Sequence, residues 1–151
     1  MHFLNFLFAI MFLGHFNGNE TNTTGVNDTT IGDIFKQYIQ IRERSWQLNA
    51  SEKSIDELVS FYDDSIQYNH VIKKDLTFTI RGKYELKKAF ENHLGETKDV
   101  TIKIVTIMVK QNIVIAELLV NRTVLKKGKW EKERGNTFIN IVEFNEKKKI
   151  S

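Results

Sequence analysis

The last third of the chain restricts the fold more than any other part of the sequence. From Val100 onward the side chains alternate with a period of two, the signature of an extended strand. A turn at residues 111–112 and a Lys-rich turn at residues 126–129 separate this run from two more, at residues 113–125 and 130–144. Long strands joined by short turns pair as antiparallel hairpins. The pattern predicts an antiparallel sheet of long strands, followed by a turn at residues 145–148.

Three helices are predicted before this sheet. The first begins at Thr30, whose hydroxyl can cap it, and ends where residues 49–51 break the pattern. A Ser-x-x-Glu capping box at Ser54 and Glu57 begins a second, short helix. A third covers residues 83–94 and is closed by Gly95. The first helix carries an apolar stripe of Ile31, Ile34, Phe35, Tyr38, Ile41 and Leu48, and the third turns Leu86, Ala89, Phe90 and Leu94 inward.

Two short strands, at residues 65–69 and 77–80, are expected between the second and third helices. Helices that precede consecutive hairpins favour packing on one face of the sheet. The predicted fold class is therefore α+β, with three N-terminal helices packed on an antiparallel sheet.

Residues 1–18 are predicted to be a secretory signal peptide. No Lys, Arg, Asp or Glu precedes Glu20, and residues 3–13 are almost wholly apolar. A run this short fits the core of a signal peptide, ~7–15 residues, better than a membrane span of about 20 residues. Cleavage is expected between Gly14 and Asn19, and an uncleaved membrane anchor is the alternative. Residues 19–30 are polar and are expected to form a flexible arm, and residues 31–151 form the folded domain.

Five Asn-x-Ser/Thr sequons accompany this leader, at Asn19, Asn22, Asn27, Asn49 and Asn121. Sequons are used only in the secretory pathway, so they agree with the signal peptide. The 151-residue chain contains no Cys, which excludes disulfides and thiol chemistry. Its net charge is +3, with Lys and Glu interleaved, which argues against a nucleic-acid partner. We expect a secreted, extracellular glycoprotein with no membrane span after signal cleavage.

Three strings of the sequence resemble a known family. They are LVSFYDDS at residues 58–65, the run from Arg81-Gly82 to Phe90, and TFINIVEFN at residues 137–145. Their order and spacing are similar to those of the SnoaL-like branch of the nuclear-transport-factor-2-like superfamily, over about residues 31–150. The resemblance implies a strongly bent sheet wrapped around a long helix, a cystatin-like cone with an apolar pocket. It also implies a further strand after Lys149-Ile150, where this sequence stops. Either the sequence is incomplete or the sheet has an exposed edge, which would favour pairing with another chain.

The resemblance also bears on chemistry, because the family includes ketosteroid isomerases, polyketide cyclases, dehydratases and members without catalysis. Asn69 and Asn140 fall where isomerase-like members carry their two acids, and the isomerase's tyrosine on the first helix falls near Glu43. An amide cannot shuttle a proton, so isomerase chemistry is not expected. Fold alone does not give the function.

Candidate ligand-binding residues are the aromatic side chains expected to line the cone, together with one amide. They are Tyr38, Trp46, Tyr62, Tyr68, Phe90, Phe138 and Asn140. His70, after the first strand, and His93, on the inward stripe of the third helix, are the alternative general acid and base. No His spacing suggests a metal site, and no cofactor is expected.

Two pairs of charged residues, Asp63 with Asp64 and Glu117 with Arg122, can each be interpreted in two ways. Asp63 and Asp64 are paired carboxylates or, more simply, the turn that ends the second helix. Arg122 and Glu117 lie on opposite faces of one strand, so one of them points inward. Arg122 would then receive a carboxylate ligand, or it extends to water at the sheet edge.

The sequence thus favours a non-catalytic secreted module that binds a small apolar molecule in the cone or assembles through its sheet, for example as a homodimer. The alternative is a SnoaL-like enzyme of the cyclase, isomerase or dehydratase type that uses His70 or His93 for proton transfer.

Overall fold

The computed structural model describes residues 28–73 and 76–151, and the side chains of residues 31–69 and 78–151. The predicted signal peptide, nearly all of the polar arm, and Asn19, Asn22 and Asn27 lie outside the described residues. No helix of the described residues is long and apolar enough to cross a membrane.

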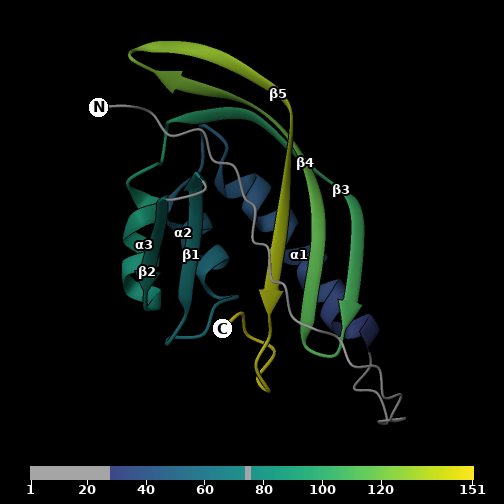
Figure 1. Ribbon diagram of the computed structural model, residues 1–151. Helices are drawn as coiled ribbons and strands as arrows, with labels where there is room; N and C mark the ends of the chain where they lie inside the picture. The colour runs from purple at the N-terminus through teal and green to yellow at the C-terminus, as the bar shows by residue number, and fades with distance from the viewer. Residues whose placement is uncertain (1–27, 74–75) are drawn as a thin grey trace.

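The described residues form three helices and five strands (Figure 1). They are α1 (Asp28–Ser45), α2 (Glu52–Val59), β1 (Gln67–Lys73), β2 (Leu76–Arg81), α3 (Lys83–Glu91), β3 (Thr97–Lys110), β4 (Ile113–Lys126) and β5 (Lys129–Glu143). The strands form two antiparallel sheets, a hairpin of β1 and β2 and a three-stranded sheet in the order β3-β4-β5. The predicted α+β class, with helices on a curved antiparallel sheet, is confirmed.

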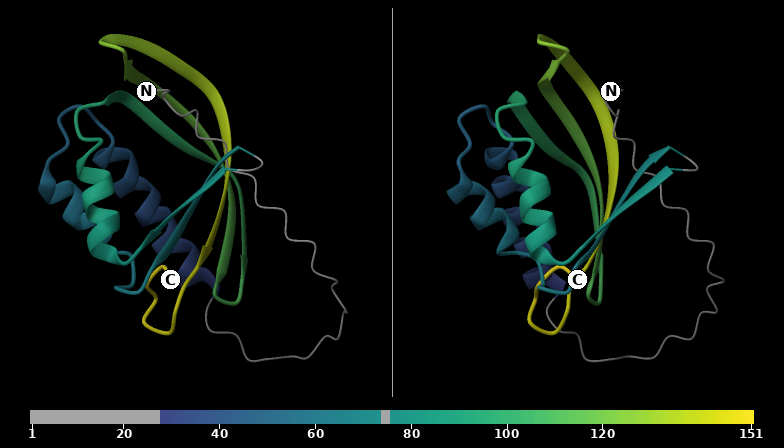
Figure 2. Two further views of the ribbon diagram at one scale, coloured as in Figure 1. Left: turned by 60° about the vertical axis from the view of Figure 1, so that its left-hand side comes forward. Right: turned by 90° about the vertical axis from the view of Figure 1, so that its left-hand side faces the viewer.

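Helix α1 packs lengthwise against the concave face of the three-stranded sheet (Figure 2). Its buried stripe meets the inward alternation of β4, which consists of Val114, Ala116, Leu118 and Val120. Polar side chains of α1 also cover the edge of β3: Glu43 Oε2 accepts the Ile102 N–H at 2.6 Å. Gln47, just after the end of α1, accepts the Val100 N–H at 3.2 Å and donates to the Val100 C=O at 2.8 Å. Side chains thus satisfy backbone groups that an edge strand would leave unpaired.

Four predicted helix boundaries were wrong. Helix α1 begins at Asp28 instead of Thr30 and ends at Ser45, which leaves Leu48 exposed. Helix α2 begins three residues early, because Ser51 donates its backbone N–H to Ser54 Oγ at 2.9 Å. Glu57, the other half of the expected box, instead binds the exposed Arg44. Helix α3 ends at Glu91 rather than at residue 94.

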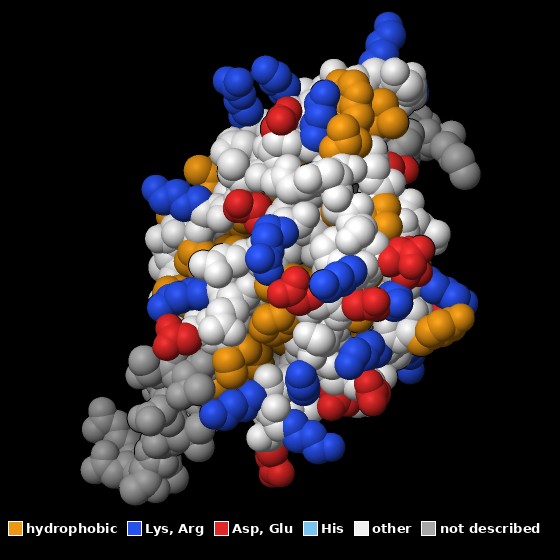
Figure 3. Space-filling model, turned by 180° about the vertical axis from the view of Figure 1, so that it is seen from behind, with side chains coloured by type: hydrophobic (Ala, Val, Ile, Leu, Met, Phe, Trp, Pro, Cys, Tyr) orange, Lys and Arg blue, Asp and Glu red, His pale blue; other side chains and the backbone are white. Residues whose placement is uncertain are grey.

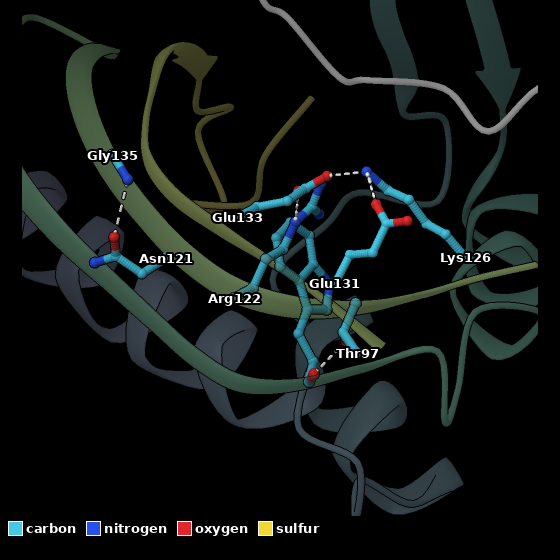
Figure 4. A network of polar contacts seen from close by, with 8 residues as sticks. Thr97, Asn121, Arg122, Lys126, Glu131, Glu133 and Gly135 are labelled. Atoms are coloured by element: carbon cyan, nitrogen blue, oxygen red, sulfur yellow. Dashed lines mark hydrogen bonds and ion pairs between the residues drawn. The ribbon is translucent and has the colours of Figure 1, made fainter. Parts of the chain in front are cut away.

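The three-stranded sheet bends where β3 and β5 each carry one residue more than β4. Between Lys98 and Thr101 β3 advances three residues while β4 advances two, and β5 has the same excess near Gly135. Gly135 lies at φ 71°, a region that favours glycine. Asn121 of β4 accepts the Gly135 N–H at 2.9 Å (Figure 4). Its amide nitrogen also donates to Thr101 Oγ1 at 3.3 Å, so one side chain links all three strands at the bend.

Beyond the bend, an ion-pair network joins β4 to β5 (Figure 4). Arg122 Nε lies 2.8 Å from one carboxylate oxygen of Glu133, and Lys126 Nζ lies 2.7 Å from the other. The side chains of Arg122 and Glu133 are each only 12% exposed. Arg122 continues the inward alternation of the central strand, so the sheet-edge reading was wrong, and Glu133 already supplies its carboxylate.

The network predicts a pH-dependent stability. Burial acts to raise the pKa of Glu133, but hydrogen bonds from Lys126 and Arg122 outweigh it and hold the pKa below its ordinary value. The ionised group therefore stabilises the fold at neutral pH, and this contribution is lost as the pH falls through the lowered pKa. Glu133→Gln should lower the free energy of unfolding at pH 7 by roughly 1–3 kcal/mol.

Urea denaturation at several pH values checks this expectation. The difference in free energy of unfolding between the wild type and Glu133→Gln should become smaller as the pH falls from about 5 toward about 2.5. Glu131→Gln is the matched control, because Glu131 meets the same Lys126 at 3.6 Å while 57% exposed. A gap that stays constant over this range would contradict the assignment.

Candidate functional site

Four of the predicted aromatic residues meet in one cluster beneath the sheet. The rings of Tyr38 and Tyr62 stand edge to face at 5.8 Å, and their hydroxyls are 2.8 Å apart. Phe90 of α3 packs on Tyr62 at 6.4 Å and on Tyr68 of β1 at 6.2 Å. Tyr38 and Tyr62 are buried, whereas Tyr68 and Phe90 keep part of their surface open. Elements far apart in the sequence therefore bring these rings together as expected.

Arg42 of α1 is the central residue that the sequence analysis missed. It is only 8% exposed, and its Nη1 donates to Asn140 Oδ1 of β5 at 3.0 Å. A longer contact of 3.5 Å joins Nη1 to the Tyr38 hydroxyl. A signal was available: Arg42 follows Phe35 and Tyr38 at steps of three and four residues, on the buried stripe of α1. A charged residue at such a position departs from the amphipathic pattern and marks a special site.

Arg42 connects the remaining predicted residues to the cluster. Its guanidinium lies 4.4 Å from the centre of the Trp46 ring, a cation–π contact. Asn140 is buried, and Phe138, two residues earlier on the same face of β5, packs half-buried against the core. These contacts link six of the seven predicted ligand-binding residues in one region around Arg42, and Phe138 lies on the face of β5 that carries Asn140. We call this region the Arg42 site.

The Arg42 site holds hydroxyl and amide groups but no negative charge at neutral pH. Burial raises the pKa of Tyr62 well above its ordinary value and also raises the pKa of Tyr68. These phenols therefore stay protonated, and they offer dipoles and hydrogen bonds rather than charge. The Asn140 amide is likewise neutral.

The residues considered for acid–base chemistry whose side chains are described, His93 and Asn69, lie outside the Arg42 site. His93 is exposed just after α3, with Nδ1 2.8 Å from Glu96 Oε2, so its predicted place on the inward stripe was wrong. The helix ends two residues before it and turns it outward. Asn69 is exposed on β1 and accepts the Thr79 hydroxyl at 2.9 Å. The backbone of His70 pairs with Phe78, and its side chain lies outside the described residues.

Asp63 serves the turn after α2. Its Oδ1 accepts the backbone N–H and hydroxyl of Ser65, at 3.0 and 2.6 Å, and Asn145 donates to Oδ2 at 2.7 Å. The hydrogen bonds from Ser65 chiefly lower the pKa of Asp63. Asp64 is exposed and pairs with Lys83 at 3.4 Å. Among the described side chains, no group of three His, Asp or Glu is placed to hold a metal ion.

A surface hollow of about 560 Å³ lies away from the Arg42 site, between α2 and α3. Half of the residues that line it are charged, among them Lys87, which pairs with both Asp56 and Glu91. Seen from behind in Figure 3, Lys and Arg alternate with Asp and Glu over the surface, without a basic face. The charges that line the hollow neutralise one another in the pairs Lys83–Asp64 and Lys87–Asp56, and we take the buried Arg42 site as the candidate.

Comparisons with known proteins support the fold. No protein-family model and no curated protein matches the sequence. A putative SnoaL-like polyketide cyclase from Shewanella putrefaciens is similar in structure, with a TM-score of 0.63 and 10% identity over 80% of this chain and 84% of that one. A SnoaL-like polyketide cyclase from Agrobacterium tumefaciens is similar with a TM-score of 0.53 and 16% identity, over 80% of this chain and 84% of that one.

An NTF2-like protein of unknown function from an Exiguobacterium gives a TM-score of 0.51 and 15% identity, over 78% of this chain and 91% of that one. Identities this low show the fold and nothing of the chemistry. The chain therefore has the nuclear-transport-factor-2-like fold of the SnoaL-like kind, as the three strings of sequence predicted.

Proposed function

We propose that the protein is a non-catalytic module that binds a small apolar molecule at the Arg42 site, within the curve of the bent sheet. The observation that carries the proposal is a set of half-buried aromatic side chains around one buried polar centre: Trp46, Tyr68, Phe90 and Phe138. Pockets for small ligands combine such apolar walls with a few fixed polar groups. The open ring surface would give an apolar molecule something to cover.

The alternative is an enzyme of the cyclase, isomerase or dehydratase type. The names of the similar structures, two of them SnoaL-like polyketide cyclases, favour it. A general acid or base must reach the reacting proton. His93 faces solvent beside Glu96, and Asn140 is an amide bound to Arg42, so His70 remains the candidate for this role.

Binding can be tested with a neutral apolar fluorophore such as N-phenyl-1-naphthylamine. We expect saturable binding to the wild type, and Trp46→Ala should weaken it about tenfold, because a large apolar contact is lost. Trp130→Ala is the matched control. Trp130 lies at the start of β5, is 39% exposed, and its ring contacts Lys98 instead of Arg42. Fluorescence titration measures all three proteins. Equal losses in the two variants, or no saturation by the wild type, would count against the proposal.

We further propose that the protein is secreted and glycosylated. The signal-like leader and the five sequons motivate this, and Asn49 lies exposed in the segment after α1, where a glycan would project into water. The full chain should be secreted from cultured eukaryotic cells with its leader removed. Native mass spectra before and after enzymatic deglycosylation give both results, and Asn49→Gln should lose one glycan. A cell-retained chain without glycans would contradict the proposal.

Assembly through the outer face of the sheet is a second candidate function. This face exposes an apolar row that crosses all three strands at one register position, formed by Met108, Ile115 and Ile141. Met108 is 60% exposed, and Val105, Ile113 and Ile139 extend the apolar area. Contiguous apolar surface of this kind suits an isologous dimer.

A dimer should dissociate when charge enters this row. We expect Met108→Lys with Ile141→Lys to shift the native mass from dimer to monomer, because two like charges would face their symmetry copies. Spectra taken before and after deglycosylation are informative beside it, since a glycan on Asn121 would lie on the same face and oppose pairing. A wild type that is monomeric with and without glycans would rule out this second function.

A further inference from the structure

Arg42 is a buried cation without a buried counter-charge in the described part of the chain. Its hydrogen-bond partners are the amide of Asn140 and the hydroxyl of Tyr38, and its ring contact is to Trp46. Burial acts to lower the pKa of Arg42, but Tyr38, Tyr68 and Tyr62 raise it, and the pKa ends above its ordinary value. The guanidinium is therefore charged, and a buried charge normally has a partner of opposite sign.

The nearby carboxylates are committed to other groups. Glu43, the next residue on α1, turns to the edge of β3 and binds the Ile102 N–H. Glu133 is held by Arg122 and Lys126. The contrast within α1 is clear, because Arg44 is exposed and paired with Glu57. No carboxylate of the described side chains pairs with Arg42, so an anionic partner would come from another part of the chain or from a ligand.

The geometry leaves Arg42 well oriented for such a partner. Both hydrogen bonds, to Asn140 and to Tyr38, use Nη1. A carboxylate binds a guanidinium through two parallel N–H groups, such as Nε and Nη2. The Trp46 ring fixes the plane of the guanidinium from one side. The orienting contacts therefore come from α1 and β5 together, before any ligand binds.

We infer that the Arg42 site takes a small apolar molecule with one carboxylate, which pairs with Arg42 while its hydrocarbon body lies against the half-buried rings of Trp46, Tyr68, Phe90 and Phe138. This rests on the proposed function and narrows it to hydrophobic carboxylic acids. The rings give affinity in proportion to the surface they cover, and the buried guanidinium gives the preference for an acid over a neutral analogue.

Matched ligand pairs test the inference. Dodecanoic acid is compared with dodecan-1-ol, and 2-naphthoic acid with 2-naphthylmethanol, by calorimetry or fluorophore displacement on the full secreted chain. The wild type should bind the acid of at least one pair about tenfold or more tightly than its alcohol, because a charge-assisted pair outweighs a neutral hydrogen bond. Equal binding of acid and alcohol would overturn the inference and leave the proposed function standing. Binding of neither would remove the proposed function as well.

Two substitutions at Arg42 and one control locate the preference. Arg42→Met keeps the apolar stem and should bind acid and alcohol about equally; the fold should survive, since replacing a buried charge by an apolar group is often neutral or stabilising. Arg42→Lys keeps the charge without the planar fork and should retain a reduced preference. Arg44→Met, on the exposed face of the same helix, should leave the preference intact. An acid preference that persists in both Arg42 variants would refute the role of Arg42.

Discussion

The sheet bends where β3 and β5 each carry one residue more than β4, and the approach of β5 to α1 at the Arg42 site depends on that bend. Asn121 holds the bend from the middle strand, through Thr101 on one side and Gly135 on the other. The curvature lets the sheet wrap α1, so that Asn140 of β5 reaches Arg42 in the last turn of the helix. A flat sheet of the same strands could not surround the helix in this way.

Local signals explain which parts of this fold the sequence predicts. The period-two runs and the turns at residues 111–112 and 126–129 depend on neighbouring residues only, and the long strands follow them closely. Helix ends were less predictable, because several side chains compete for the same backbone groups. Ser54 was expected to open α2, yet it accepts the Ser51 N–H and so becomes the third residue of a helix that begins earlier.

The residues of the Arg42 site also differ in how well the sequence predicts them. Rings such as Tyr38 and Phe90 were predictable because apolar periodicity points them into the core. Arg42 was overlooked because a charged residue on a helix is usually solvated, and its pairing with Asn140 spans 98 positions of sequence. His93 failed for the opposite reason: the inward stripe of α3 stops at the helix end, and no periodicity signal reports where that end falls. Long-range polar contacts and helix ends were thus beyond pattern reasoning.

The buried guanidinium also bears on the choice between ligand binding, assembly and catalysis. A protein selected only to assemble through its outer sheet face would gain stability by replacing Arg42 with an apolar residue, because desolvating a charge is costly. Retaining a cation among neutral tyrosines makes physical sense when something supplies the missing charge. A chemical step at the same place would need a group able to take up a proton, whereas the tyrosines stay protonated and Asn140 is an amide. On the proposed function, the interior holds an acid rather than transforming one.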